Sequence, residues 1–172
     1  MKFYLRGAWS WDLGIGVIFG CTLAALALSA EVREQGVTVA LAAGAFAVAI
    51  MSVVLGALAV ITAFFDGPYR RVLEHAGGGV REALAAYFVV VAVAGAAALA
   101  ALVTALGWPV FCKWGQMASI GVTGLLTGWS VAGMVSLVEL TIFHAVQRAK
   151  LMQGIDKAAQ VGAPQVRPNA PE

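Results

Sequence analysis

The sequence predicts an all-α integral membrane protein, specifically a bundle of four transmembrane helices joined by short loops. Of its 172 residues, 61% are hydrophobic and 12% are charged, against about 25% charged in an ordinary soluble domain. The mean hydropathy of +0.88 is correspondingly high. Four long stretches carry most of the apolar residues, and most basic residues fall outside them. This composition excludes a soluble globular domain, and the net charge of +2 is too small for a nucleic-acid binder.

The four apolar stretches cover about residues 13–30, 37–65, 83–107 and 116–143. A helix needs roughly 20 apolar residues to cross a hydrocarbon core about 30 Å thick. The first three stretches contain no charged residue, and the fourth contains one, Glu139. They are too long for barrel strands, and they are continuously apolar rather than alternating. Because a bilayer offers no water to backbone groups, we expect four helices in one membrane domain over residues 1–146.

The connections between these stretches contain typical helix breaks. Residues 31–36 form a short charged break. The 66–82 connection opens with an Asp-Gly-Pro turn that can start a new helix, and a Trp-Pro pair at 108–109 ends the third stretch. After the fourth stretch, residues 147–172 form a tail rich in proline, for which we expect disorder beyond about residue 160.

Basic residues predict the orientation, because lysine and arginine are enriched in cytoplasmic loops. One side would carry only Arg33 and Lys113. The other would carry the remaining nine, namely Lys2, Arg6, Arg70, Arg71, Arg81, Arg148, Lys150, Lys157 and Arg167. We therefore expect both termini and the middle loop in the cytoplasm, with the protein in a bacterial-type plasma membrane.

The middle loop also contains an amphipathic segment. Residues 68–76 mix apolar side chains with arginine and glutamate, which is typical of a short helix lying on the anionic inner leaflet. We expect the lipid headgroups to be contacted by Arg70, Arg71 and Arg81.

The first stretch has a second interpretation as a cleaved secretory signal. Two basic residues precede an apolar run that ends in Ala-Leu-Ser-Ala at 27–30, a pattern that resembles a cleavage site. Asp12 and two neighbouring tryptophans favour an uncleaved helix. Cleavage would leave three spans with an outside N-terminus, and the charge distribution does not distinguish the two cases.

Small residues predict how the helices associate. In lipid, helix association depends on close backbone approach and on interhelical hydrogen bonds, and the chain contains 20 glycines as well as many alanines. We expect packing faces at small residues repeated every fourth or third position, although some of these spacings reflect composition. The candidates are Gly16, Gly20, Ser52, Gly56, Ala92, Ala96, Ala100, Gly121, Gly124 and Gly128.

Glu139 is the candidate proton or cation site. A carboxylate inside a span is costly and normally faces protein or a wet cavity. At 100° per residue, Glu139 lies in line with Gly121 and within about 20° of Gly128, so it continues the small-residue face of the last span. It either binds protons or cations, or it is a structural carboxylate bonded to Ser136 or to a neighbouring helix.

No other residues form a recognisable chemical motif. His75 and His144 are predicted at the solvated cytoplasmic surface, with no spacing typical of a metal site. Cys21 and Cys112 lie at different depths, which is unfavourable for a disulfide. We therefore expect no metal, no cofactor and no catalytic activity.

Three functional hypotheses follow. The first is a non-catalytic assembly or accessory component that associates, through small-residue helix faces, with itself or with a larger membrane protein, in contact with lipid and without nucleic acid. The second is an oligomeric pore, such as a holin-like lesion former, or a small proton- or cation-linked transporter that uses Glu139 and a hydroxyl stripe at Ser119, Thr123 and Thr127. The third is an intramembrane enzyme.

The predicted topology can be tested by thiol labelling. We expect Cys112 to react with a membrane-impermeant thiol reagent in intact cells, because it lies at the outer end of the third span. Cys21 should stay protected until the membrane is dissolved. Labelling of Cys112 only in inverted vesicles would show the opposite orientation, and a mature N-terminus near Glu31 would show a cleaved signal.

Overall fold

The computed structural model describes residues 2–64 and 79–162, and this part of the chain is helical with no strand. The long helices are α1 (Lys2–Leu26), α3 (Gly36–Phe64), α5 (Gly79–Gly107) and α6 (Lys113–Gly162), and a short helix, α2 (Ala30–Glu34), lies between α1 and α3. Ser29 caps α2, since its side chain accepts a hydrogen bond from the Val32 backbone N–H.

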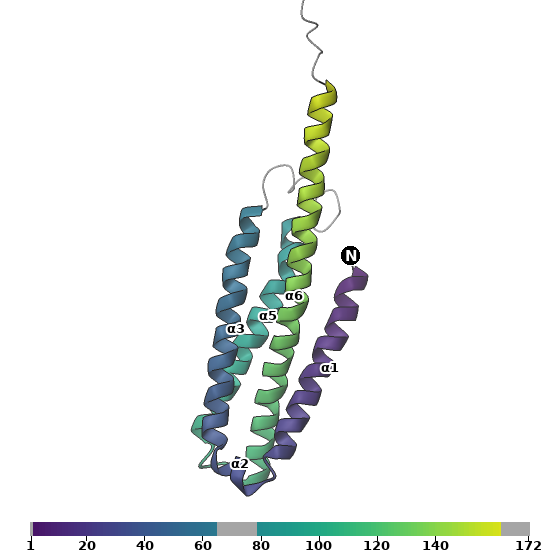
Figure 1. Ribbon diagram of the computed structural model, residues 1–172. Coiled ribbons are helices and arrows are strands. Elements are labelled where there is room, and N and C mark those ends of the chain that lie inside the picture. Colours follow the sequence, from purple (N-terminus) through teal and green to yellow (C-terminus); the bar gives the residue numbers. More distant parts are fainter. Residues whose placement is uncertain (1, 65–78, 163–172) are drawn as a thin grey trace, which may run out of the picture.

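The long helices run side by side along a common direction (Figure 1). α1 packs mainly against α6, and α3 packs mainly against α5. α6 also contacts both α5 and α3, so it connects the two pairs. α2 and the short connections lie together at one end of the molecule (Figure 1).

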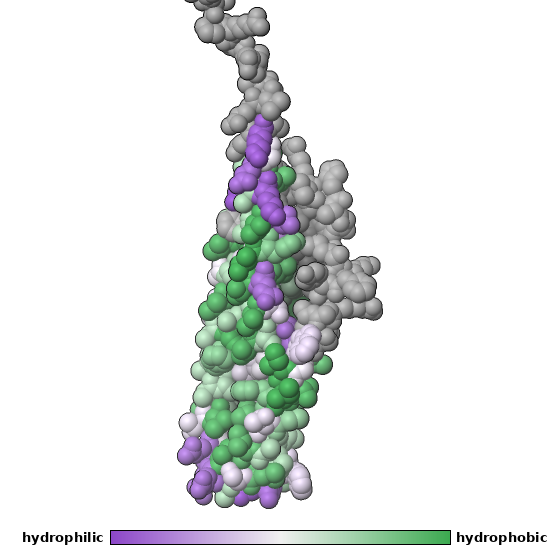
Figure 2. All heavy atoms as spheres, turned by 45° about the vertical axis from the view of Figure 1, so that its right-hand side comes forward, coloured by the Kyte–Doolittle hydropathy of each residue, from purple (hydrophilic) through white to green (hydrophobic). Residues whose placement is uncertain are grey.

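In the part of the chain that the structure describes, three helices are long and apolar enough to cross a membrane, which indicates a membrane protein. The candidate spans are Gly36–Ala63, Leu84–Gly107 and Lys113–Ile155, whereas α1 contributes a shorter apolar segment, Trp11–Leu26. On the face shown in Figure 2, hydrophobic residues cover most of the surface, hydrophilic residues gather toward its two ends, and a smaller hydrophilic patch lies between them. Because the apolar segment of α1 is shorter than the three candidate spans, the fourth span stays a prediction.

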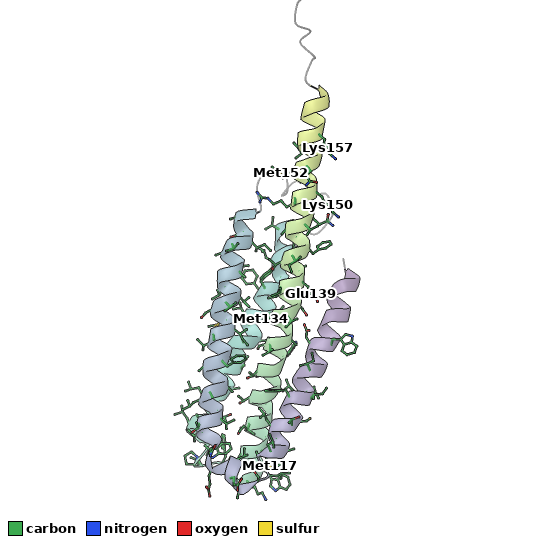
Figure 3. All side chains as sticks on the ribbon, viewed as in Figure 1. Met117, Met134, Glu139, Lys150, Met152 and Lys157 are labelled. Carbon is green, nitrogen blue, oxygen red and sulfur yellow. The ribbon has the colours of Figure 1, made fainter. Side chains whose placement is uncertain are left out.

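α6 is much longer than the predicted fourth span. It continues without a break from Lys113 to Gly162, about 75 Å at the α-helical rise, and so runs through the predicted span at 116–143 and into the predicted tail that starts at 147. The reason is that residues 144–162 contain no proline and consist largely of good helix formers such as alanine, glutamine and lysine. Its last turns extend beyond the other helices, as the labels of Lys150, Met152 and Lys157 show (Figure 3).

The main apolar core lies between α3, α5 and α6. It contains Ile50, Val54 and Ile61 of α3, Tyr87 of α5 and Leu137 of α6. The Tyr87 side chain is fully buried, and its hydroxyl group is 2.5 Å from the Thr141 hydroxyl of α6. A polar side chain is therefore accommodated in the core because it has a partner on the next helix.

A second core lies at the end of the molecule that contains α2. Trp108 is 7% exposed, and its ring lies so close to Gly36 that a Cβ there would overlap the ring. Trp108 Nε1 donates to the Arg33 carbonyl oxygen at 3.1 Å, and Gln116 Nε2 donates to the Trp108 carbonyl oxygen at 2.9 Å. These bonds connect the α2–α3 region with the connection between α5 and α6.

Candidate functional site

Glycines from both helices lie at the contact between α1 and α6. A Cβ on Gly20 would lie 2.7 Å from the Gly121 carbonyl oxygen and 2.8 Å from Leu125 Cβ, and one on Gly16 would lie 2.8 Å from the Leu125 carbonyl oxygen. Such separations are shorter than any real Cβ makes. The backbones of α1 and α6 therefore approach each other as closely as they do only because these two positions carry no side chain.

The glycines of α6 complete the same contact. A Cβ on Gly128 would lie 2.8 Å from Phe19 Cβ, one on Gly124 would lie 2.6 Å from Leu23 Cδ1, and one on Gly121 would lie 3.1 Å from Ala24 Cβ. The structure thus brings together five of the predicted packing residues. We call this contact the α1–α6 glycine seam, formed by Gly16, Gly20, Gly121, Gly124 and Gly128.

The other predicted packing residues do not form seams within the chain. Ser52 and Gly56 of α3 are exposed, and a Cβ on Gly56 would meet no atom within 4 Å. Ala92 and Ala96 of α5 are also exposed, and Ala100 is half-buried. Each step of four residues rotates the position by about 40° around a helix. Residues 92, 96, 100 and 104 therefore do not all lie on the same face of α5. The buried alanines of α5 are instead Ala94, Ala97 and Ala101.

Asp12 lies beyond the Gly16 end of the glycine seam and is buried there. Its side chain is 9% exposed, and the Ser136 hydroxyl of α6 lies 3.0 Å from Asp12 Oδ1 and 3.2 Å from Oδ2. A hydroxyl group has one proton to donate, so this single donor serves both carboxylate oxygens. We did not predict this contact, although Asp12 precedes Gly16 by four residues and Gly20 by eight, which places all three on one face of α1.

Glu139 lies one helical turn beyond Ser136 on α6 (Figure 3). Its side chain is exposed, and its negative charge acts unfavourably on the Asp12 carboxylate. The sequence suggested a hydrogen bond between Ser136 and Glu139. In the structure, the Ser136 hydroxyl donates to Asp12 instead. Asp12 of α1, Ser136 of α6 and Glu139, one helical turn further along α6, thus lie at the junction of α1 and α6, and we call them the Asp12–Ser136–Glu139 cluster.

His144 is buried, which contradicts the predicted solvated position. It is 3% exposed, and its ring lies edge-on to Phe143 with 5.9 Å between the ring centroids. His144 follows the buried Leu137 by seven residues, so the two share the inward face of α6. Within residues 2–64 and 79–162, no three His, Cys, Asp or Glu side chains lie close enough together to hold a metal ion.

The predicted hydroxyl stripe of α6 is bonded within the bundle. Thr123 and Thr127 are buried and donate to backbone carbonyl oxygens of their own helix at 2.9 and 2.8 Å. Thr123 also lies 3.1 Å, oxygen to oxygen, from the Thr104 hydroxyl of α5, and Ser119 donates to the Gln116 carbonyl oxygen at 3.0 Å. Of the three hydroxyl groups in the stripe, that of Thr123 thus contacts a neighbouring helix, whereas those of Ser119 and Thr127 donate within α6.

The remaining predicted residues fall into two groups. Arg70, Arg71 and His75 lie outside the described residues, and Arg81 lies in the first turn of α5, with a side chain that is likewise outside the description. Cys21 and Cys112 are both free and exposed.

No protein-family model, curated protein or solved structure matches the chain. A function therefore has to be inferred from the residues. Among the described parts, the glycine seam fixes two helices, the Asp12–Ser136–Glu139 cluster offers carboxyl groups, and the exposed small residues of α3 offer a surface for close helix contact.

The packing role of the seam predicts a large effect of added volume at Gly128. We expect Gly128→Leu to lower the free energy of unfolding by about 1–3 kcal/mol, the usual cost of overpacking, because even a Cβ at this position is too close to Phe19. Thermal unfolding of the detergent-solubilised protein measures the effect.

The matched control is Gly154→Leu, in the same helix, where a Cβ would meet nothing within 4 Å. Val131→Leu, which adds one methylene group to α6, is a second control. We expect Gly128→Leu to be several-fold more disruptive than either control. Equal effects of the three substitutions would mean that the glycines reflect composition and not a packing requirement.

Proposed function

We propose that the chain is a non-catalytic assembly component of a bacterial-type plasma membrane, with four transmembrane helices and cytoplasmic termini. In this proposal it associates with a second copy of itself, or with a larger membrane protein, through the outer face of α3. The observation that carries the proposal is a row of exposed small residues along the whole of α3.

This row follows a strict seven-residue repeat. We call it the α3 outer stripe, formed by Thr38, Ala42, Ala45, Ala49, Ser52, Gly56, Ala59 and Ala63, all of which are exposed. Their alternating steps of four and three residues keep them on one side of the helix. The opposite side consists of residues that pack into the chain, Ala40, Ala47, Val54 and Ile61. The stripe therefore points directly away from the core.

Bulky side chains border the α3 outer stripe on both sides. One border consists of Leu41, Val48 and Leu55, which are 46–53% exposed, and the other of Phe46, Val53 and Val60, which are 52–60% exposed. The stripe is thus a shallow row of small side chains between two apolar ridges.

A second copy of α3 is complementary to this surface. In a parallel pair of helices with a seven-residue repeat, residues at the edge of the helix–helix contact also face each other. A residue at one edge lies opposite the residue five positions later on the partner helix. This rule pairs Leu41 with Phe46 of the second copy. It likewise pairs Val48 with Val53 and Leu55 with Val60. Each ridge of one chain would therefore face a ridge of the other, while the small residues let the two backbones approach.

The bilayer favours such contacts between small residues. Leucine-rich faces gain nothing by leaving lipid, so membrane helices associate through close packing at small residues. The glycine seam of α1 and α6 shows the same use of small residues inside the chain. Ser52 adds no unsatisfied polar group, because its hydroxyl donates to the Val48 carbonyl oxygen at 3.0 Å.

The fourth span in this proposal is α1, supported by its contact with α6. Its apolar segment of 16 residues, Trp11–Leu26, is shorter than the roughly 20 residues that a span usually needs. Packing along α6 compensates, since the glycine seam and the Asp12–Ser136 hydrogen bond hold α1 beside a longer span. The distribution of basic residues supports cytoplasmic termini.

The assembly proposal predicts that bulk on the α3 outer stripe prevents association. We expect the parent protein to be oligomeric in mild detergent and the Gly56→Leu variant to dissociate to monomers, because a leucine between the ridges keeps a partner helix at a distance. Native mass spectrometry measures the oligomeric state and detects any co-purifying membrane protein.

The matched control is Thr62→Leu on the same helix. Thr62 is exposed and continues the ridge of Leu41, Val48 and Leu55, so a leucine there extends the ridge and should preserve the oligomer. Both variants should keep the helix content of the parent, since both positions are exposed and a Cβ on Gly56 meets no atom within 4 Å. A parent protein that is monomeric and without a partner would contradict the proposal, and so would equal association of the Gly56→Leu variant.

A second candidate function is supported by the Asp12–Ser136–Glu139 cluster. Asp12 of α1 accepts a hydrogen bond from Ser136 of α6, and Glu139 follows Ser136 by one helical turn. Carboxyl groups within membrane helices typically mark proton or ion pathways. The glycine seam keeps the α1 and α6 backbones together beside it, so a transport path through it would need further copies of the chain around the site. The candidate is therefore a proton- or cation-linked oligomer.

The Glu139→Gln variant distinguishes the two candidates. We expect it to fold at least as well as the parent, because it keeps the hydrogen-bonding capacity while removing a charge that repels Asp12. Proton and cation flux into liposomes should be negligible for both the parent and the variant. Glu31→Gln, which alters an exposed carboxylate of α2, is the control. Flux in the parent that survives in the Glu31→Gln variant and vanishes in the Glu139→Gln variant would favour transport over assembly.

A further inference from the structure

We draw no further inference here: the strongest candidate, the Asp12–Ser136–Glu139 cluster at the junction of α1 and α6, belongs to the site already described, and no second feature among the described residues points to a ligand there.

Discussion

Close backbone contact between α1 and α6 is the constraint on which the arrangement of the long helices depends. α1 packs mainly on α6, and α6 in turn contacts α5 and α3, so among the described residues the glycine seam is the closest part of the contact that holds α1 beside the other helices. Side chains as small as alanine at Gly16 or Gly20 would meet backbone atoms at 2.8 Å or less. The same approach brings Asp12 to Ser136. The position of the candidate carboxyl cluster is therefore a consequence of glycine packing.

Polar groups support this arrangement at three levels of the bundle. Trp108 bonds the Arg33 backbone near α2, Thr104 and Thr123 join α5 to α6, and Tyr87 reaches Thr141. Each pair crosses between elements, and hydrogen bonds of this kind are favourable where a bilayer offers no competing water. Among the described residues, the buried hydroxyl groups therefore have partners within the chain, while the small side chains of the α3 outer stripe are exposed.

Sequence reasoning predicted the helical class and the grouping of small residues on α1 and α6, because composition and helical phase are local properties. It did not predict which faces would meet. The pairs Gly16–Gly20 and Ser52–Gly56 have the same spacing, yet the first is packed against α6 and the second is exposed. The difference depends on which helix neighbours which. Asp12 was missed for a related reason, since Ser136 lies 124 residues away, and His144 was misplaced because its burial depends on the inward face of α6.

Disulfide cross-linking tests the α1–α6 contact most directly. In a chain with Cys21→Ser and Cys112→Ser, the pair Ala24→Cys and Gly121→Cys should oxidise readily, because a Cβ at 121 would lie 3.1 Å from Ala24 Cβ, close to the Cβ separation of about 3.5–4.5 Å in disulfides. A protease site inserted within residues 65–78 allows the chain to be cut into two fragments. The fragments separate unless a disulfide joins them. The control pair Ala49→Cys and Gly121→Cys, with Ala49 on the α3 outer stripe, should stay separable within a monomer. We expect the first pair to remain as one full-length band after cleavage, whereas release of its two fragments under oxidising conditions would contradict the glycine seam.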